Sequence, residues 1–324
     1  MGEVCYNELI CSGQVPVLQT KGRTSDMVHI LYNPLSGSGK GFDRAQALHE
    51  LLRDRELNFC DIREIKDYAE FFAGIGEDDE LVIAGGDGTL NKFINFTADL
   101  TYPKNLFYYA MGSGNDFRQD VAPAETGLIP LSEYVRNLPT VTVNGKSCRF
   151  LNGIGYGIDG YCCEVGDKLA KKSDKPINYA GIAIKGLLFH YKPTTATVTV
   201  DGVSKTYKKV WLAPTMNGRY YGGGMDIAPA QDRLNPDRTV SAVVLFGSGK
   251  LKTLLVFPSI FKGEHVKHTE MVAIASGHEV TVKFDRPVAL QIDGELVLNV
   301  TEYTVRSVAK QQSQEPETAT VTEA

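Results

Sequence analysis

The first part of the chain alternates between two patterns of apolar and polar residues. Short apolar runs recur, and most are followed by a stretch whose apolar residues stand three or four positions apart. This alternation predicts strands that take turns with helices, as in a doubly wound α/β domain with a parallel sheet. The predicted elements, in chain order, are strand 27–32, helix 42–55, strand 58–65, helix 67–73, strand 81–84, a helix from 89 and strand 106–111.

From about residue 140 onward, the strands are joined by hairpin dipeptides instead of helices. Asn-Gly and Asp-Gly pairs favour the positive φ angles of a two-residue type I′ turn between antiparallel strands. This half of the chain is therefore predicted to be an antiparallel sandwich or flattened barrel. The hairpin dipeptides are Asn144-Gly145, Asp201-Gly202 and Asp293-Gly294.

These patterns divide the chain into four parts. An α/β domain is expected at 25–139 and a β-rich domain at 140–300. Residues 1–24 show no periodicity, and residues 311–324 are polar and rich in Thr and Glu. Both ends are therefore predicted to be poorly ordered.

Composition narrows the class of protein. Hydrophobic residues make up 43% of the 324 residues and the net charge is −5, as in an ordinary soluble globular protein. A mildly acidic chain gives no electrostatic reason to expect nucleic acid as a partner. The longest apolar runs are too short for a transmembrane segment, and the six cysteines show no CxxC or zinc-ligand spacing. We expect a cytoplasmic protein with reduced thiols.

The run ELVIAGGDGTLN carries the clearest chemical signal. A short strand leads directly into Gly85-Gly86-Asp87-Gly88-Thr89, and a helix follows. At such a turn the backbone N–H groups and the helix dipole favour an anion, above all phosphate. A carboxylate beside a phosphate indicates a metal ion or a reacting proton between them. The alternative is that Asp87 simply caps the helix.

Two more glycine-rich loops follow predicted strands. The run SGSGKG at 36–41 is not a Walker A motif, because Pro34 and Gly41 stand where that motif requires Gly and Ser or Thr. The run GSGNDF at 112–117 contains Asp116, which either provides a second carboxylate for magnesium or forms an Asx turn. Since ligands bind beyond the carboxyl ends of parallel strands, the three loops are expected to line one crevice.

Six short motifs follow one another along the chain. They are NPLSGSGKG (33–41), GGDGTLN (85–91), GSGNDF (112–117), NGIGYGIDG (152–160), YGGGMDIAP (221–229) and LQIDGE (290–295). In their order and spacing they resemble the catalytic domain of the diacylglycerol kinases. The chain is thus similar to soluble bacterial lipid kinases of the diacylglycerol and sphingosine kinase family. The resemblance implies an ATP-binding α/β domain, a β-rich lipid-binding domain, and a return of 301–310 to the first domain.

The resemblance also implies roles for single residues. Asp87 and Asp116 would join a water-linked magnesium network, and Asp293 would accept the proton of the lipid hydroxyl. Glu295, beside Asp293, would assist at the nucleotide or the metal. Asp159 matches a position that contacts the lipid head group in relatives that act on sphingoid bases. The residues implied to bind ATP are Asn33, Ser36, Gly37, Gly85, Gly86, Gly88, Thr89, Gly112 and Ser113.

Two positions depart from the family pattern. Lys92 stands in the helix after GGDGTLN where relatives usually have Glu. Relatives often read Asp-Asp-Gly after the GGG motif and bind a structural magnesium ion there, whereas this chain reads AQDRLNPDR at 230–238. Asp232 and Asp237 remain candidate ligands for that ion.

The resulting prediction is a kinase that uses ATP and Mg²⁺ to phosphorylate a lipid hydroxyl at a membrane surface. Diacylglycerol, giving phosphatidic acid, is the first acceptor; a sphingoid base or other lipid alcohol is the second. The alternatives are an NAD kinase, which shares the GGDGT loop, and a catalytically silent nucleotide or lipid sensor. The segments 180–192 and 251–268 either rest on a membrane or pack in the core, and their pattern favours the core. If they rest on a membrane, the protein would associate with it transiently. A homodimer is left open.

Overall fold

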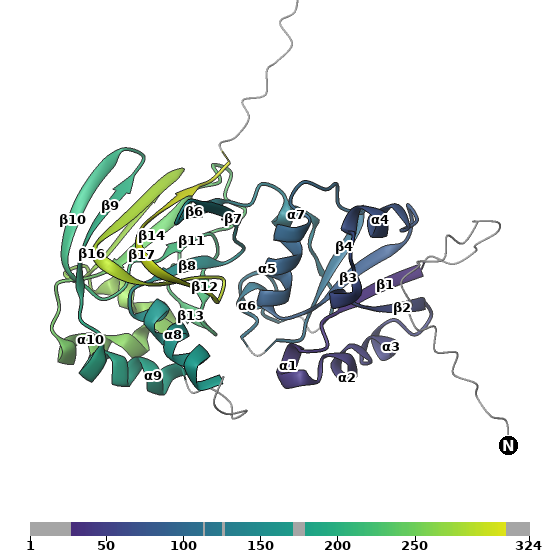
Figure 1. The fold of residues 1–324 in the computed structure, drawn as a ribbon, viewed down its shortest axis with the longest axis horizontal. Helices are drawn as coiled ribbons and strands as arrows, with labels where there is room; N and C mark the ends of the chain where they lie inside the picture. Colours follow the sequence, from purple (N-terminus) through teal and green to yellow (C-terminus); the bar gives the residue numbers. More distant parts are fainter. Residues whose placement is uncertain (1–26, 113, 125–126, 171–178, 309–324) are drawn as a thin grey trace, which may run out of the picture.

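The computed structural model describes residues 27–112, 114–124, 127–170 and 179–308. Ser113 and the predicted poorly ordered ends, 1–24 and 311–324, lie outside these residues. Two β-sheets lie side by side, each with its own helices (Figure 1).

The first sheet has five strands in the order β2-β1-β3-β4-β5. Its first four strands are parallel, and β5 runs antiparallel to β4. β3 is buried along most of its length, as its run of Leu, Val, Ile and Ala predicts. The bounds are β1 Met27–Tyr32, β2 Glu56–Asp61, β3 Glu80–Gly85, β4 Asn105–Ala110 and β5 Ile129–Pro130.

Short helices connect these strands. The predicted helix 42–55 is divided into two short helices, α2 and α3. The predicted strand 58–65 ends early at Asp61, because the Asp61 side chain accepts a hydrogen bond from Arg63 N and starts a 3-10 turn, Ile62–Glu64. The helices are α1 Ser36–Gly39, α2 Gly41–Ala45, α3 Leu48–Leu51, α4 Tyr68–Ala73, α5 Asp87–Phe96, α6 Asp116–Val121 and α7 Ser132–Val135.

The second sheet is antiparallel and has ten strands. Its main path runs β15-β14-β11-β8-β16-β17-β6-β7, and β9 pairs with both β16 and β10. A separate pair, β12 Tyr220–Tyr221 and β13 Met225–Asp226, lies beside it. The bounds are β6 Thr140–Val143, β7 Lys146–Arg149, β8 Gly153–Tyr156, β9 Thr194–Val200, β10 Val203–Val210, β11 Thr215–Met216, β14 Val240–Leu245, β15 Val272–Gly277, β16 Glu279–Ile292 and β17 Glu295–Arg306.

All three predicted hairpins are present. They join β6 to β7, β9 to β10 and β16 to β17. Every one of their six turn residues has a positive φ, from 46° at Asp201 and Asp293 to 92° at Gly294. The antiparallel β-rich half predicted from these dipeptides is confirmed.

The expected return of 301–310 to the first domain is wrong for the part that the structure describes. Strand β17 continues to Arg306 and pairs with β16 and β6 of the second sheet. Val300, Tyr303 and Val305 of this strand are buried in the core of the β-rich domain. Burial of these apolar side chains keeps the strand in the second sheet.

Helices gather at one end of the β-rich domain (Figure 1). Within the described residues, no helix is long and apolar enough to cross a bilayer. The inward side chains of the helices at this end of the domain share one core cluster with Trp211 and Tyr221. The helices are α8 Ile158–Ala170, α9 Tyr179–Lys185, a π-helical turn Gly186–His190, α10 Lys250–Val256, and the 3-10 turns Phe257–Lys262 and Glu264–Lys267.

Candidate active site

The loops after β1 and β3 lie against each other at the carboxyl edge of the parallel sheet. Asn33 N donates to Ala84 O at 3.0 Å, and Asn33 Nδ2 donates to Thr89 Oγ1 at 2.8 Å. The Ser36 hydroxyl lies 3.4 Å from the same Thr89 oxygen. Thr89 therefore ties the first glycine loop to the second, which the predicted shared crevice requires.

The loops after β3 and β4 meet through glycines. A Cβ added to Gly112 would lie 2.7 Å from Gly86 Cα, so a side chain at Gly112 would force the loops apart. A Cβ added to Gly85 would lie 2.5 Å from Thr89 Cβ. By contrast, a Cβ on Gly88 would meet no atom within 4 Å, so this residue faces open space.

The start of α5 has no side-chain cap. Gly86 is the N-cap residue, and the Asp87 side chain turns to the neighbouring helix α6 instead. There Asp87 Oδ2 accepts from Asp116 N at 2.8 Å, and Oδ1 accepts from Phe117 N at 3.2 Å. The interpretation of Asp87 as the cap of its own helix is wrong. The ten-residue helix α5 thus presents uncapped backbone N–H groups at the glycine loop.

Asp116 links the two domains. Its carboxylate accepts hydrogen bonds from Gly223 N at 2.9 Å and Gly224 N at 2.6 Å. Both glycines belong to the GGG motif of the second domain and have positive φ angles, 83° and 104°, which L side chains rarely adopt. The alternative Asx-turn role for Asp116 is replaced by a contact between domains.

Asp293 occupies the β16–β17 turn and reaches the boundary between the domains. Its Oδ1 accepts from Asn152 N at 2.8 Å and Gly153 N at 2.9 Å. Its Oδ2 accepts from Leu151 N at 2.5 Å and Asn91 Nδ2 at 2.9 Å. The carboxylate is thus held in a fixed orientation by donors from both domains.

Asn91 is a site residue to which the sequence motifs gave no role. It lies four residues after Asp87 on α5, so the two side chains share one face of that helix. The spacing of four residues could have revealed this role, because a helix face that directs Asp87 to the site also directs Asn91 to it.

Three carboxylates, Asp87, Asp116 and Asp293, influence one another's charge. Burial, the Asp116 charge and the Asp293 charge raise the pKa of Asp87 to about 6. Burial also raises the pKa of Asp116 and of Asp293, against the effect of their backbone hydrogen bonds. Like charges collected in one place favour a proton or a bound cation.

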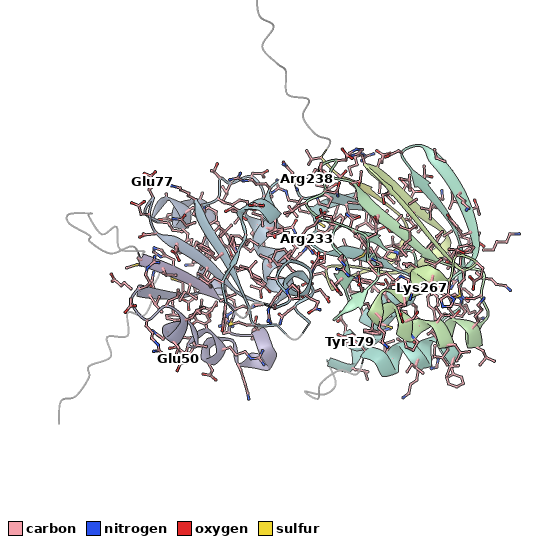
Figure 2. The ribbon with its side chains drawn as sticks, turned by 180° about the vertical axis from the view of Figure 1, so that it is seen from behind. Glu50, Glu77, Tyr179, Arg233, Arg238 and Lys267 are labelled. Atoms are coloured by element: carbon pink, nitrogen blue, oxygen red, sulfur yellow. The ribbon has the colours of Figure 1, made fainter. Side chains whose placement is uncertain are left out.

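Arg233 was also missed, although it belongs to the segment that departs from the family pattern. Its guanidinium forms a buried ion pair with Asp120 of α6 at 2.5 Å and lies 4.7 Å from the centre of the Phe117 ring. It also donates to Leu151 O at 3.3 Å and Asn152 Oδ1 at 3.1 Å. Figure 2 shows Arg233 between the two domains. The Arg233 guanidinium therefore joins α6, whose first N–H groups bond to Asp87, to Leu151 and Asn152, whose N–H groups bond to Asp293.

Lys92 and Glu295 form an ion pair across the domain boundary, with Nζ 3.2 Å from Oε1. Both side chains are more than half exposed, at 60% and 55%. The unusual lysine in α5 thus faces the acidic residue that follows the β16–β17 turn. Exposure limits the contribution of such a pair to about 0–1 kcal/mol.

Asp159 lies at the start of α8, on the side of Gly155 where Gln291 also lies, because a Cβ on Gly155 would meet both side chains. It is buried, and Tyr221 OH donates to its Oδ2 at 2.8 Å. Burial raises its pKa to about 6, and the Tyr221 bond opposes that rise.

Comparisons with known proteins bear on this arrangement. A family model described as "Diacylglycerol kinase catalytic domain" matches residues 27–138. A second, "YegS C-terminal NAD kinase beta sandwich-like domain", matches residues 152–311. The chain belongs to the diacylglycerol kinase-like lipid kinases. The family resemblance and the kinase class predicted from the six motifs are confirmed.

Single proteins similar to this chain are also described as diacylglycerol kinases. A diacylglycerol kinase of Mycobacterium tuberculosis (strain CDC 1551 / Oshkosh) is 25% identical over 256 residues, which cover 75% of this chain and 81% of the relative. A crystal structure of a diacylglycerol kinase from Bacillus anthracis str. Sterne superposes with a TM-score of 0.59 at 20% identity, covering 89% of this chain and 96% of that one. The structural match supports the two-domain lipid kinase fold.

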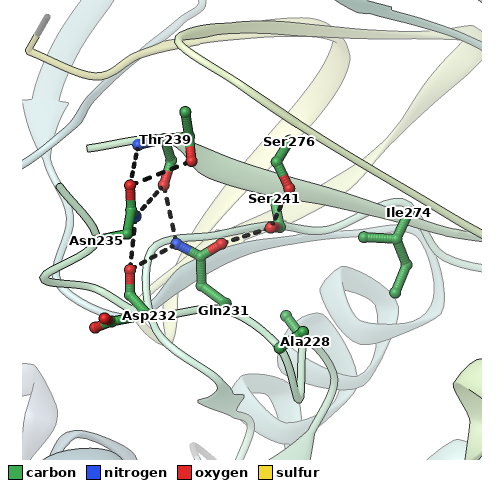
Figure 3. Close-up of a pocket in the computed structure, with 9 residues that line it drawn as sticks. Ala228, Gln231, Asp232, Asn235, Thr239, Ser241, Ile274 and Ser276 are labelled. Atoms are coloured by element: carbon green, nitrogen blue, oxygen red, sulfur yellow. Dashed lines mark hydrogen bonds between the residues drawn. The ribbon is translucent and has the colours of Figure 1, made fainter. Parts of the chain in front are cut away.

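The segment 230–238 of this lipid kinase is held by amide side chains. Figure 3 shows Gln231 and Asn235 bonded to the main chain. Gln231 Nε2 donates to Thr239 O at 2.9 Å, and Asn235 Nδ2 donates to Asp232 O at 2.6 Å. Both residues also line a cavity of about 160 Å³.

The candidate metal ligands of this segment are both exposed. Asp232 Oδ1 accepts from Leu234 N at 2.8 Å in a local turn. Asp237 is exposed as well. In the described ranges, no group of three or more His, Cys, Asp or Glu side chains could hold a metal ion directly. The structural magnesium site expected at Asp232 and Asp237 stays a prediction.

Proposed function

We propose that this lipid kinase transfers the γ-phosphoryl group of ATP to a lipid hydroxyl, with diacylglycerol as the acceptor and phosphatidic acid as the product. The observation that carries this proposal is the uncapped start of α5 at Gly86–Gly88, directly beside the carboxylates of Asp87 and Asp116. An anion-binding helix start next to acidic residues suits a phosphoryl group held through a divalent cation.

The nucleotide phosphates would lie over the three glycine loops. Gly85, Gly86, Gly88 and Gly112 let the backbone come close to a ligand, and Gly88 faces open space. Asn33, Ser36 and Thr89 already form one hydrogen-bonded group beside these glycines. A Cβ on Gly37 would lie 2.5 Å from the guanidinium of Arg44. The lack of a side chain at Gly37 therefore makes room for the Arg44 guanidinium beside the first loop. The expected role of Ser113 in ATP binding stays a prediction, because Ser113 lies outside the described residues.

Magnesium fits the acidic group through water. Both oxygens of Asp87 and both of Asp116 already accept backbone hydrogen bonds, which leaves each oxygen one further lone pair. Burial and the neighbouring Asp116 charge raise the pKa of Asp87, and a bound cation would offset both effects. Mg²⁺ usually keeps several of its waters, so these carboxylates would hold it as outer ligands. When bound, it would neutralise phosphate charge.

Asp293 would accept the proton during transfer. The lipid hydroxyl oxygen forms a bond to the γ-phosphorus while the bond from that phosphorus to the β–γ bridging oxygen breaks, and ADP leaves. The hydroxyl proton passes to a carboxylate oxygen of Asp293. The four donors around Asp293 orient it for this step. Glu295, paired with Lys92, would adjust charge at the same boundary.

A sphingoid base is the second candidate acceptor, because Asp159 is a buried acid bonded to Tyr221. Its carboxylate would suit the ammonium group of such a base. The head group of diacylglycerol carries no charge that would need this partner. The choice between acceptors therefore depends on whether Asp159 lies within reach of the head group.

The test is a transfer assay with γ-labelled ATP and Mg²⁺, in which diacylglycerol, sphingosine and NAD are offered singly. We expect label in phosphatidic acid, identified by mass. Labelled sphingosine phosphate would move the acceptor to the sphingoid bases. Labelled NADP would favour the NAD kinase alternative. No transfer to any of the three would favour a silent nucleotide or lipid sensor.

A further inference from the structure

An apolar face is exposed on the helices at one end of the β-rich domain. Figure 1 shows α8, α9 and α10 gathered there, at the lower end of the domain in that view. Several large apolar side chains on these helices and the turns next to them reach solvent, and we call five of them the apolar face. They are Ile184 (43% exposed), Phe189 (73%), Leu251 (74%), Leu255 (81%) and Phe261 (46%).

Core packing does not account for this face. The inward side chains of the α10 region, Val256, Phe257 and Ile260, are already buried in the core. Leu251 and Leu255 stand four residues apart and share the opposite side of the helix. A helix that only covers a sheet normally carries polar residues on its outer side. Helix α10 has apolar residues on its inner and its outer side. The expectation that segment 251–268 only packs in the core is therefore incomplete.

The elements that carry the apolar face form one packed unit. Lys250 Nζ donates to Leu188 O at 2.7 Å, which ties α10 to the π-helical turn. Leu187 of that turn is buried in the same cluster as Val256 and Ile260. The exposed side chains therefore stand on a fixed base, as a docking surface requires.

Lysines outnumber acidic residues in the segments that carry the apolar face. Residues 179–192 contain two lysines, Lys185 and Lys192, and no acidic residue. Residues 250–268 contain four lysines and a single glutamate, Glu264. Two of these four are neutralised by ion pairs, Lys252 with Glu270 and Lys267 with Glu264, so the excess positive charge comes from the other lysines.

We propose that the apolar face docks this kinase on a bilayer that contains anionic phospholipid. The leucine and phenylalanine side chains would enter the boundary between head groups and acyl chains, and the lysines would lie among the phosphates. The inference rests on the proposed lipid kinase function, because a lipid acceptor lies in a bilayer. Helix α8 carries Asp159 in its first turn and the exposed Leu169 in its last turn.

A second copy of the chain fits this face less well than a bilayer. A symmetric dimer would bring the same lysines of both copies together, and like charges across an interface oppose association. An anionic membrane supplies the opposite charge.

The test is co-sedimentation with vesicles in the absence of ATP, so that binding is measured apart from catalysis. Vesicles of phosphatidylcholine alone are compared with vesicles that also contain phosphatidylglycerol. The variants are Leu251→Gln/Leu255→Gln for the apolar side chains and Lys185→Gln/Lys262→Gln for the charge. Their controls are Val203→Gln, which removes a 76% exposed side chain of the distant β10 strand, and Lys146→Gln on β7.

We expect wild type to bind the anionic vesicles more tightly than the neutral ones. The leucine pair variant should lose about tenfold or more of this partitioning, and the lysine variant should lose the preference for anionic lipid. Both controls should bind like wild type, and all variants should keep the wild-type rate on a short-chain acceptor dissolved below its micelle concentration. Unchanged vesicle binding by the leucine pair variant would overturn the proposal. So would a dimer in sedimentation velocity that this variant abolishes, whereas loss of the soluble-acceptor reaction would concern the proposed function instead.

Discussion

Asn91 Nδ2 donates a hydrogen bond to Asp293 Oδ2 at 2.9 Å, across 202 positions of sequence. The donor stands on the helix that follows the second glycine loop, and the acceptor stands in a hairpin turn of the other domain. This contact fixes the proposed proton acceptor relative to the proposed phosphate site. The geometry of transfer thus depends on both domains at once.

The two Asp-Gly turns should differ in their effect on stability. Asp201 uses a single oxygen, Oδ1, to accept from His278 N and Glu279 N, and Asn offers the same oxygen. Asp293 uses both oxygens, so Asn would direct an NH₂ group at two donors. We expect Asp293→Asn to lower the free energy of unfolding by about 1–3 kcal/mol and Asp201→Asn to change it little. Urea denaturation measures both, and equal losses would contradict the assignment of donors around Asp293.

Asp87→Asn should separate fold from activity. The variant keeps one carbonyl oxygen for a backbone N–H at the start of α6 and loses the charge. Because it also relieves repulsion with Asp116, we expect a melting temperature close to that of wild type and a rate of transfer reduced by about 100-fold or more. A wild-type rate with bound nucleotide would show that the charge of Asp87 has no part in the reaction.

Arg233→Met should destabilise the protein strongly. It leaves the buried carboxylate of Asp120 without its partner, and breaking a buried ion pair costs about 3–5 kcal/mol. Arg238→Met is the matched control, since Arg238 lies at the edge of the molecule in Figure 2 and is partly exposed. Its cost should stay near 0.5 kcal/mol or below. Adding Asp120→Asn to Arg233→Met should recover part of the loss, and no recovery would contradict the proposed pairing.

Stability and activity should change in opposite directions between about pH 4 and pH 6. The pKa of Asp87 and of Asp159 is raised to about 6, above the unfolded value of 3.8. The folded protein then binds these protons more tightly, so the free energy of unfolding falls as the pH rises through this window. Asp61 and Asp79, whose pKa is lowered, act below it, and the lowered pKa of buried His265 opposes the trend near pH 6.

We therefore expect the ligand-free protein to melt at a higher temperature at pH 5 than at pH 7. The value of kcat/KM should fall below about pH 6, because catalysis needs charged Asp87. In the variant Asp159→Asn the rise in melting temperature should be smaller. A melting temperature that increases from pH 5 to pH 7 would contradict the raised pKa values.

The fold could be predicted from the sequence where local pattern and tertiary structure agree. Alternating strands and helices gave the parallel sheet, and Asp-Gly and Asn-Gly gave the hairpins. The end of the chain could not be predicted in this way. Val300, Tyr303 and Val305 suit either domain by pattern, and their burial in the second core decided the pairing of β17.

The candidate site could be predicted only in part. Glycine loops after strands reveal a phosphate crevice, because ligands of parallel sheets bind at that edge. The side-chain partners depend on contacts between distant segments, which no local pattern records. Asn91 and Arg233 are such partners, and the direction of the Asp87 carboxylate toward α6 is another.

The rate of phosphoryl transfer from labelled ATP to diacylglycerol, measured side by side for wild type, Asp293→Asn and Asp201→Asn below their melting temperatures, tests the central claim most directly. Loss of a general base typically costs about 100- to 10,000-fold. The account predicts labelled phosphatidic acid with wild type and with Asp201→Asn at similar rates. It predicts a rate reduced by that factor with Asp293→Asn, while ATP binding persists. Equal rates for all three proteins, or no labelled lipid with wild type, would contradict it.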